Sequence, residues 1–312
     1  MGDTEIAWTR KSINPGVFGC SADGAECTNC YAEVMAARQE HMAVARGQTE
    51  GGYIGTTHKA GGRAKWKGRV TVDRARVAPA FASLPVKGCA VFVTSMADLH
   101  HDEVPYDYLE LVYREMEARP RHWFQVLTKR PHNAARFLYE TGRHETMGEH
   151  IWIGTTAGDP KRGRLRLHNL GQVPAANLFV SMEPLLGAID PSPWLGRDLT
   201  GGGRIRWVIA GGESGTAARP SHPEWFRTVR DACTRTSTSF FFKQWGSWTP
   251  AAMPDLHEAN AGRQVCFRAD GREQWAPSAS WTFATMERTQ ASQATPKLDG
   301  VVAQAFPEGG AP

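Results

Sequence analysis

The sequence predicts an α/β protein built on a partial parallel (β/α)6 barrel of the TIM-like kind. Six short apolar runs each end in polar or glycine residues, and most of the gaps between them show helical patterns. The runs hold β-branched and aromatic residues without alternation, which is typical of strands buried on both faces of a parallel sheet. They recur about every 26 to 33 residues, which is the rhythm of repeated βα units.

The elements follow in order along the chain. A first strand is expected before a cysteine-rich loop, with a helix after that loop. The six apolar runs predict strands over 90–93, 123–127, 151–154, 177–180, 207–210 and 240–242. Helices are expected over 106–118, 131–139 and 223–233, whereas the pattern of 161–172 is ambiguous.

The chain divides into three parts. We expect the barrel over 1–250, with a basic, glycine-rich insertion at 41–76. The segment 251–287 contains a short apolar run and an Asp270-Gly271 turn signal, which indicates a small β appendage. From 288 to 312 large apolar residues are scarce, so we expect a flexible tail.

Composition sets the protein class. The 312 residues are 41% hydrophobic and 22% charged, which is ordinary for a globular protein and excludes disorder or coiled coil for the whole chain. No run of about 18 apolar residues occurs, and the first ten residues contain no apolar leader segment. We therefore expect a cytoplasmic protein without membrane contact.

Positive charge is concentrated in the insertion. The whole chain has a formal net charge of +4. The stretch 41–76 alone carries +6, from eight Lys or Arg against Glu50 and Asp73, so the rest of the chain is slightly acidic. Together with Tyr53 and Trp66, of which Trp66 is the better stacking candidate, this composition suits a nucleic-acid backbone and a stacked base. The alternative is a solvated surface loop.

Three of the six cysteines lie close together, at Cys20, Cys27 and Cys30. Three thiolates from one loop can hold three irons of a [4Fe–4S] cluster and leave the fourth iron open for a ligand. A structural zinc ion needs four ligands, so zinc would require a histidine such as His41, His58, His100 or His101. The residues alone leave iron–sulfur, zinc and plain thiols open.

Polar residues at the predicted strand ends indicate an active site, because the carboxyl ends of barrel strands carry catalysis in this architecture. Asp98, Lys129 and Glu183 are the candidate catalytic residues. The candidate cofactor-binding residues are Ser95, Ser181, Gly211, Gly212, Glu213, Ser214 and Lys243. The glycine pair would let backbone approach a ligand while Glu213 accepts hydrogen bonds, or it could simply form a tight turn.

A family resemblance rests on motifs spread over about residues 6 to 250. They are Ile6-Ala7-Trp8-Thr9, Asn14-Pro15 with Gly19-Cys20, Cys27-Thr28-Asn29-Cys30-Tyr31-Ala32-Glu33, Phe92-Val93-Thr94-Ser95-Met96-Ala97-Asp98-Leu99, Gln125-Val126-Leu127-Thr128-Lys129-Arg130-Pro131, Ser181-Met182-Glu183-Pro184-Leu185-Leu186-Gly187, Gly211-Gly212-Glu213-Ser214-Gly215 and Phe241-Phe242-Lys243-Gln244-Trp245-Gly246. By these the chain resembles a phage-associated three-Cys-motif family of uncharacterised proteins, which is in turn similar to the radical S-adenosylmethionine (SAM) enzymes.

That resemblance implies a [4Fe–4S] cluster at the barrel mouth, SAM on its open iron, an electron donor, and a 5′-deoxyadenosyl radical that abstracts hydrogen from the substrate. The cysteine motif departs from the superfamily pattern in two ways. Its spacing is C-x6-C-x2-C instead of C-x3-C-x2-C, and Asn29 replaces the aromatic residue that precedes the third cysteine. The Gly-Gly-Glu element also lies on a late strand instead of an early one.

The sequence thus predicts a radical SAM enzyme that acts on a nucleotide or nucleic acid, with a modified DNA base as the candidate substrate. The alternative is a zinc-stabilised, non-redox protein that binds or hydrolyses nucleic acid.

Overall fold

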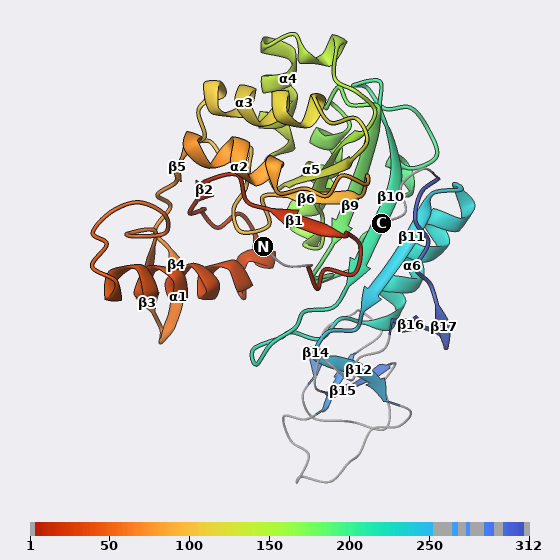
Figure 1. The fold of residues 1–312 in the computed structure, drawn as a ribbon. Helices are drawn as coiled ribbons and strands as arrows, with labels where there is room; N and C mark the ends of the chain where they lie inside the picture. Colours follow the sequence, from red (N-terminus) through yellow and green to blue (C-terminus); the bar gives the residue numbers. More distant parts are fainter. Residues whose placement is uncertain (1–3, 252–263, 268–272, 275–283, 290–295, 309–312) are drawn as a thin grey trace.

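A seven-stranded parallel sheet, curled into a half-barrel, forms the centre of the structure (Figure 1). The computed structural model describes residues 4–251, 264–267, 273–274, 284–289 and 296–308. In both spatial and chain order the strands are β1 (Lys11–Ile13), β6 (Ala90–Val93), β7 (Trp123–Thr128), β8 (Ile151–Thr156), β9 (Asn177–Met182), β10 (Arg204–Gly211) and β11 (Ser239–Gln244). The six predicted apolar strands are therefore confirmed, and every neighbouring pair runs parallel.

Helices cover the outer side of this sheet. They are α2 (Val77–Ala82), α3 (Tyr106–Glu117), α4 (Pro131–Glu140), α5 (Pro160–Leu170) and α6 (Pro223–Arg235), while α1 (Tyr31–Ala45) projects away from the sheet (Figure 1). Short 3-10 helices span Ala25–Cys27, Arg74–Arg76, Arg143–Glu145 and Ser192–Trp194. The ambiguous segment 161–172 is thus mostly helical, whereas β9 and β10 are joined by a 3-10 turn without an α-helix.

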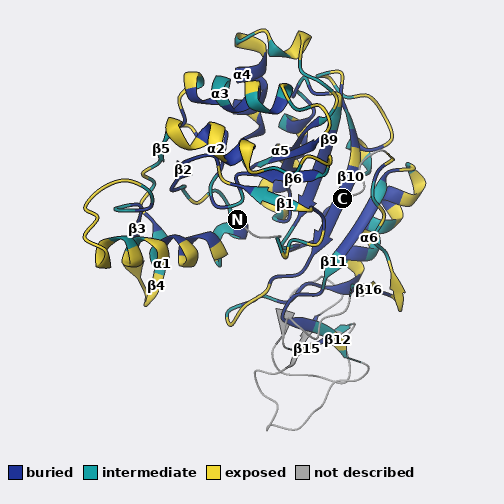
Figure 2. Ribbon diagram, viewed as in Figure 1, coloured by how far each residue is buried: buried dark blue, intermediate teal, exposed yellow. Residues whose placement is uncertain are grey.

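Both faces of the sheet are buried, as the continuous apolar runs predicted (Figure 2). Alternate side chains of a strand point to opposite faces. The outer face packs aliphatic residues and the rings of Phe124, Phe240 and Phe242 against the helices. The inner face carries an aromatic cluster that includes Trp8, Trp123, Trp152 and Trp207. The interior of the half-barrel is therefore packed, and a ligand has to approach from the strand ends.

The C-terminal segment differs from the flexible tail that the sequence predicted. Residues 296–308 include the hairpin strands β16 (Lys297–Leu298) and β17 (Val301–Val302), and then run beside β11. Trp207 donates from Nε1 to the Ala305 carbonyl at 3.0 Å, and the Phe306 ring lies 5.1 Å from the Phe241 ring. The prediction was wrong for these residues because the aromatic inner face needs a cover that composition alone does not reveal. Residues 290–295 and 309–312 lie outside the described part.

The basic insertion is folded, although the sequence suggested a loop. A hairpin of β3 (Thr57–Ala60) and β4 (Arg63–Trp66) packs on α1, and β5 (Thr71–Val72) pairs with β2 (Val17–Phe18). Trp66 and Tyr53 are both buried, in one cluster with Phe18. The prediction that Trp66 stacks on a base was wrong, since its side chain forms the core of the insertion.

After the last barrel strand, the described residues include a small antiparallel sheet. Its strands, in spatial order, are β12 (Trp248–Ala251), β15 (Ala284–Arg288), β13 (Gln264–Phe267) and β14 (Glu273–Gln274). The Asp270-Gly271 turn lies outside the described residues. No helix in the described ranges is long and apolar enough to span a membrane.

Candidate metal centre at the carboxyl edge of the sheet

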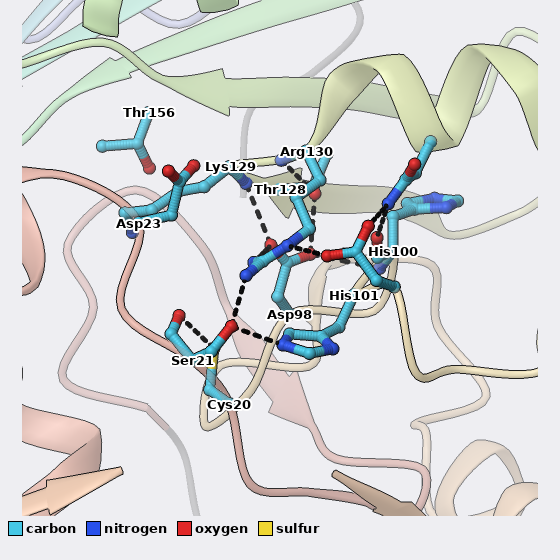
Figure 3. Close-up of polar contacts among 12 residues, drawn as sticks. Cys20, Ser21, Asp23, Asp98, His100, His101, Thr128, Lys129, Arg130 and Thr156 are labelled. Atoms are coloured by element: carbon cyan, nitrogen blue, oxygen red, sulfur yellow. Dashed lines mark hydrogen bonds and ion pairs between the residues drawn. The ribbon is translucent and has the colours of Figure 1, made fainter. Parts of the chain in front are cut away.

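The three clustered cysteines lie on one loop between β2 and α1. The first of them, Cys20, lies beside Asp98, Thr128 and Arg130 at the carboxyl ends of the central strands (Figure 3). All three cysteines are partly buried free thiols. Cys27 Sγ accepts a hydrogen bond from the Asp23 backbone at 3.4 Å. Cys30 is the N-cap residue of α1, so its sulfur lies where the first backbone N–H groups of a helix favour negative charge.

Burial opposes ionisation of Cys20 and Cys30. It is the largest influence on Cys20, whose pKa it raises to about 12 with help from the Asp98 carboxylate. Burial also raises the pKa of Cys30, against the opposite effects of Lys129 and the N–H groups of Ala32 and Glu33. Because the thiolate is the metal ligand, a bound cation would have to supply the remaining stabilisation.

Lys129 is the cation that faces this loop. Its pKa is raised: burial alone would lower it, but Cys27, Cys30 and Glu26 outweigh that effect. Its backbone N–H donates to Asp98, while its ammonium group makes no hydrogen bond or ion pair within the described residues. An unsatisfied ammonium group beside three thiols is a binding element for an anion.

Asp98 joins two strand ends. Its Oδ1 accepts from Thr128 Oγ1 at 2.6 Å and from the His100 backbone at 3.1 Å, and its Oδ2 accepts from Lys129 N at 3.1 Å and Arg130 Nη1 at 3.0 Å (Figure 3). Burial works against ionisation, yet Arg130 and Thr128 hold the pKa of Asp98 below its usual value. All of its acceptor positions serve protein donors, so here this predicted catalytic residue ties the ends of β6 and β7 together.

A serine–histidine pair sits beside the first cysteine. Ser21 Oγ lies 2.7 Å from His101 Nε2 and accepts from Arg130 Nη2 at 2.6 Å. His101 Nδ1 accepts from the Glu103 backbone N–H at 3.1 Å, so in the neutral ring the proton is on Nε2 and is donated to Ser21. His101 is therefore not a base for Ser21, and the hydroxyl hydrogen of Ser21 is free to point toward a ligand.

Neither adjacent histidine is exposed, contrary to what a surface loop would give. His100 is 1% and His101 5% exposed, and His100 Nε2 lies 2.9 Å from Tyr113 Oη. Both ring nitrogens of His101 have protein partners, so this side chain would have to break a contact to become a fourth zinc ligand.

A buried ion pair fixes the middle of the loop. Glu26 Oε1 accepts from Arg166 Nη1 at 2.8 Å and from the backbone of Gly158 and Asp159, while Arg166 also contacts Asp23. The Glu26 side chain is 1% and that of Arg166 4% exposed. The loop is thus anchored to the segment that follows β8.

A second clamp holds the turn between Cys27 and Cys30. Asn29 donates from Nδ2 to Glu213 Oε2 at 3.0 Å and to the Ala217 carbonyl at 2.9 Å, and its Oδ1 accepts from Arg63 Nη1 at 2.9 Å. Arg219 pairs with both oxygens of Glu213 and also donates to the Ala25 carbonyl. Glu213, predicted to bind a cofactor, therefore contacts the cysteine loop.

The other predicted site residues lie along the same edge. Lys243 Nζ and Ser181 Oγ approach Glu183 at 3.0 and 3.4 Å, and a Cβ on Gly211 would come within 2.9 Å of Glu183 Oε1. Ser214 accepts from Gln244 at 2.9 Å, and a Cβ on Gly212 would overlap the Trp245 carbonyl oxygen. Ser95 joins the edge through Asn14, whose Nδ2 lies 3.4 Å from Ser95 Oγ.

Sequence reasoning did not assign roles to Glu26, Arg166, Asn29 or Arg219. A signal was available for two of them, because Glu26 and Asn29 are polar residues inside the cysteine motif itself. Arg166 and Arg219 had no such signal, since only the fold brings these distant residues to the loop.

The donor chemistry of this loop fits an iron–sulfur cluster. It offers three free thiols, a cation opposite them, and a hydroxyl hydrogen available for an anion. In the described part of the chain no three His, Cys, Asp or Glu side chains are already gathered as a metal-binding group. A cluster would therefore draw the sulfur atoms together, around the anchors at Glu26 and Asn29.

Fold and site together define an α/β half-barrel protein with a cysteine loop at its carboxyl edge. The chain belongs to the family described as protein of unknown function (DUF5131), whose model matches residues 3–307. No curated protein and no solved structure matches the chain.

Proposed function

We propose that the protein is an iron–sulfur, SAM-dependent radical enzyme of the partial-barrel type, acting on a nucleotide or nucleic acid such as a modified DNA base. The observation that carries this proposal is the loop of three free thiols facing the unsatisfied ammonium group of Lys129. Thiols kept free in this way suit a reducing compartment, so we place the protein in the cytoplasm.

Cys20, Cys27 and Cys30 would hold three irons of the cluster. When bound, cluster and SAM supply one-electron cleavage chemistry that produces a carbon radical for hydrogen abstraction, with the electron coming from an external donor. Three protein ligands leave one iron for SAM, which is the arrangement that a substrate-binding cluster requires.

The side chains around the cysteine loop would position the bound group and neutralise its negative charge. Lys129 offsets the negative charge of the thiolates or pairs with the SAM carboxylate. Ser21 donates its free hydroxyl hydrogen into the same space. Asp98 holds Arg130, and through it Ser21, in place.

The packed aromatic interior has a functional consequence. Since Trp207 and its neighbours fill the half-barrel, substrate has to reach the cysteine loop from the carboxyl edge. Ser95, Ser181 and Lys243 lie along that edge, and we propose that they contact SAM or substrate. The packed aromatic interior also excludes water from the side of the cysteine loop that faces the half-barrel, which protects a radical from quenching.

The test is metal content after anaerobic purification and reconstitution. We expect about four irons and four sulfides per chain and a broad absorption band near 400 nm, lost in Cys27→Ala and retained in Cys89→Ala, whose thiol lies outside the loop. Incubation with SAM and dithionite should then release 5′-deoxyadenosine. One zinc ion and no iron in the wild-type protein would overturn the proposal.

A further inference from the structure

The insertion contains two adjoining hollows that the cysteine chemistry does not use. Their volumes are about 450 and 480 Å³, and they lie on either side of the Gly51–Gly52 loop, with Phe18 and Asp73 lining both. Volumes of this size are typical of small-ligand sites, which span about 300 to 1,000 Å³. We propose that they bind a nucleotide unit of a single-stranded nucleic acid.

The first argument is charge. Arg46 lines one hollow and Arg69 the other, and both side chains are exposed. Arg74 and Arg76 also line them, but these two are paired with Asp107 and Asp73. Arg46 and Arg69 make no ion pair within the described residues, so each offers a free guanidinium group for a phosphate.

The second argument is the lining. Phe18 forms an apolar base, with the Arg76 guanidinium carbon 5.1 Å from its ring centroid and the Tyr53 ring edge-on at 5.0 Å. A planar guanidinium group on an aromatic ring offers a stacking surface for a nucleobase. Four arginines against Asp73 and Glu50 give the walls a net positive charge, which matches a base with its phosphate better than a bare inorganic anion.

The third argument is the open backbone between the hollows. Gly51 and Gly52 have φ angles of +85° and +57°, and a Cβ at either position would meet nothing within 4 Å. Glycine in this conformation leaves the main chain accessible to a close ligand. Neither position is required for internal packing, so this glycine pair is consistent with a binding loop.

The position links these hollows to the cysteine loop. Phe18 is two residues before Cys20, and Gly19 between them lies directly against the Arg69 carbonyl. A single-stranded nucleic acid bound in the two hollows would pass beside Cys20. The inference thus deepens the proposed function by giving its nucleic-acid substrate a binding site, and it rests on that function only for the identity of the reaction.

The test is fluorescence anisotropy with labelled single-stranded DNA and RNA of about twelve nucleotides, on protein without cluster. We expect Arg46→Ala and Arg69→Ala each to weaken binding about tenfold and to lower the salt slope by about one. Lys59→Ala and Lys67→Ala remove the same charge from exposed positions of the insertion that do not line the hollows, and should change affinity less than threefold. Thermal unfolding midpoints check that all four variants fold.

Two results would overturn the inference. If the lysine variants lose as much affinity as the arginine variants, the insertion acts only as a diffuse positive surface. If inorganic phosphate displaces the strand as well as a nucleoside monophosphate does, the hollows recognise phosphate and no base. Because these measurements need no cluster, their failure is separate from a failure of the iron assay, and the arginine variants should retain normal iron content.

Discussion

Asp98→Asn tests whether the stability of the carboxyl edge of the sheet depends on the buried negative charge of Asp98. The substitution keeps the shape and the Oδ1 acceptor for Thr128 and His100. It places an amide nitrogen where Oδ2 accepts from Lys129 N and Arg130 Nη1 at 3.1 and 3.0 Å. Two donors would then face a third donor, and the buried Arg130 would lose its counter-charge.

Breaking a buried pair by removing one partner costs about 3 to 5 kcal/mol. Asp102 also binds Arg130, at 3.1 Å, and retains part of the compensation, so we expect a loss of about 3 kcal/mol. An unfolding entropy of about 2.1 cal/mol/K per residue over 312 residues gives about 0.65 kcal/mol/K. The melting temperature should therefore fall by about 5 °C.

The assay is urea unfolding followed by tryptophan fluorescence, with thermal melting as a second measurement. Asp102→Asn is the matched control, because this carboxylate contacts the same arginine but is 60% exposed, and should lose less than about 1 kcal/mol. Equal losses of unfolding free energy in the two variants would refute the reasoning, since the buried Asp98 would then stabilise the fold no more than the exposed Asp102 does. Faster alkylation of Cys20 in Asp98→Asn would show that the Asp98 carboxylate helps to keep this thiol protonated, as the raised pKa of Cys20 predicts.

Two further predictions concern buried groups elsewhere. Burial lowers the pKa of His100 to about 4, so between pH 6.5 and about 4 only the unfolded chain takes up this proton. His100 should therefore account for a fall of about 3 kcal/mol in the unfolding free energy across that window, in addition to the contributions of His101, His122 and His222, whose pKa values burial also lowers. His100→Gln should reduce the slope by this amount while the exposed His132→Gln leaves it unchanged, as urea midpoints measured against pH will show. Gly212→Ala should cost more than about 2 kcal/mol because its Cβ would overlap the Trp245 carbonyl oxygen. Gly171→Ala should cost less, because the atom nearest to its Cβ would be the His168 carbonyl oxygen at 3.2 Å, and comparable denaturation midpoints for the two variants would contradict this steric argument.

The strands were predictable because a strand buried on both faces needs a continuous run of apolar residues, which is visible in a short window of the sequence. Trp207, Val208, Ile209 and Ala210 form a continuous apolar run that no exposed strand could tolerate, and the run maps directly onto β10. The tail was not predictable in the same way. Phe306 packs on Trp207 and Phe241, and nothing within a local window shows that the inner aromatic face needs this distant ring.

The helix after the cysteines shows a different limit of pattern reading. Ala32, Val34, Met35 and Ala36 predicted a helix correctly, yet the helix buries Ala32 and Ala36 and exposes Val34 and Met35. Its buried side also holds Glu33, which pairs with Lys65 at 3.0 Å. Hydrophobicity alone therefore does not show which side of this helix is buried, because hydrogen bonding by Glu33 to Lys65 and to the Trp66 backbone decides how the helix packs on the insertion.

The candidate site shows why three cysteines in sequence do not by themselves make a site. The loop is fixed by partners from Arg166 and Glu213, which lie more than a hundred residues away and reach it only because parallel strands end at one edge. These anchors hold the backbone at Glu26 and Asn29 while leaving the thiols free to rearrange. The arrangement separates two tasks, since the clamps establish where the loop lies and a bound metal would determine how its sulfur atoms converge. A variant that loosens a clamp, such as Glu213→Gln, should therefore weaken metal binding without removing any ligand, and Cys27→Ala should remove a ligand without loosening the clamp.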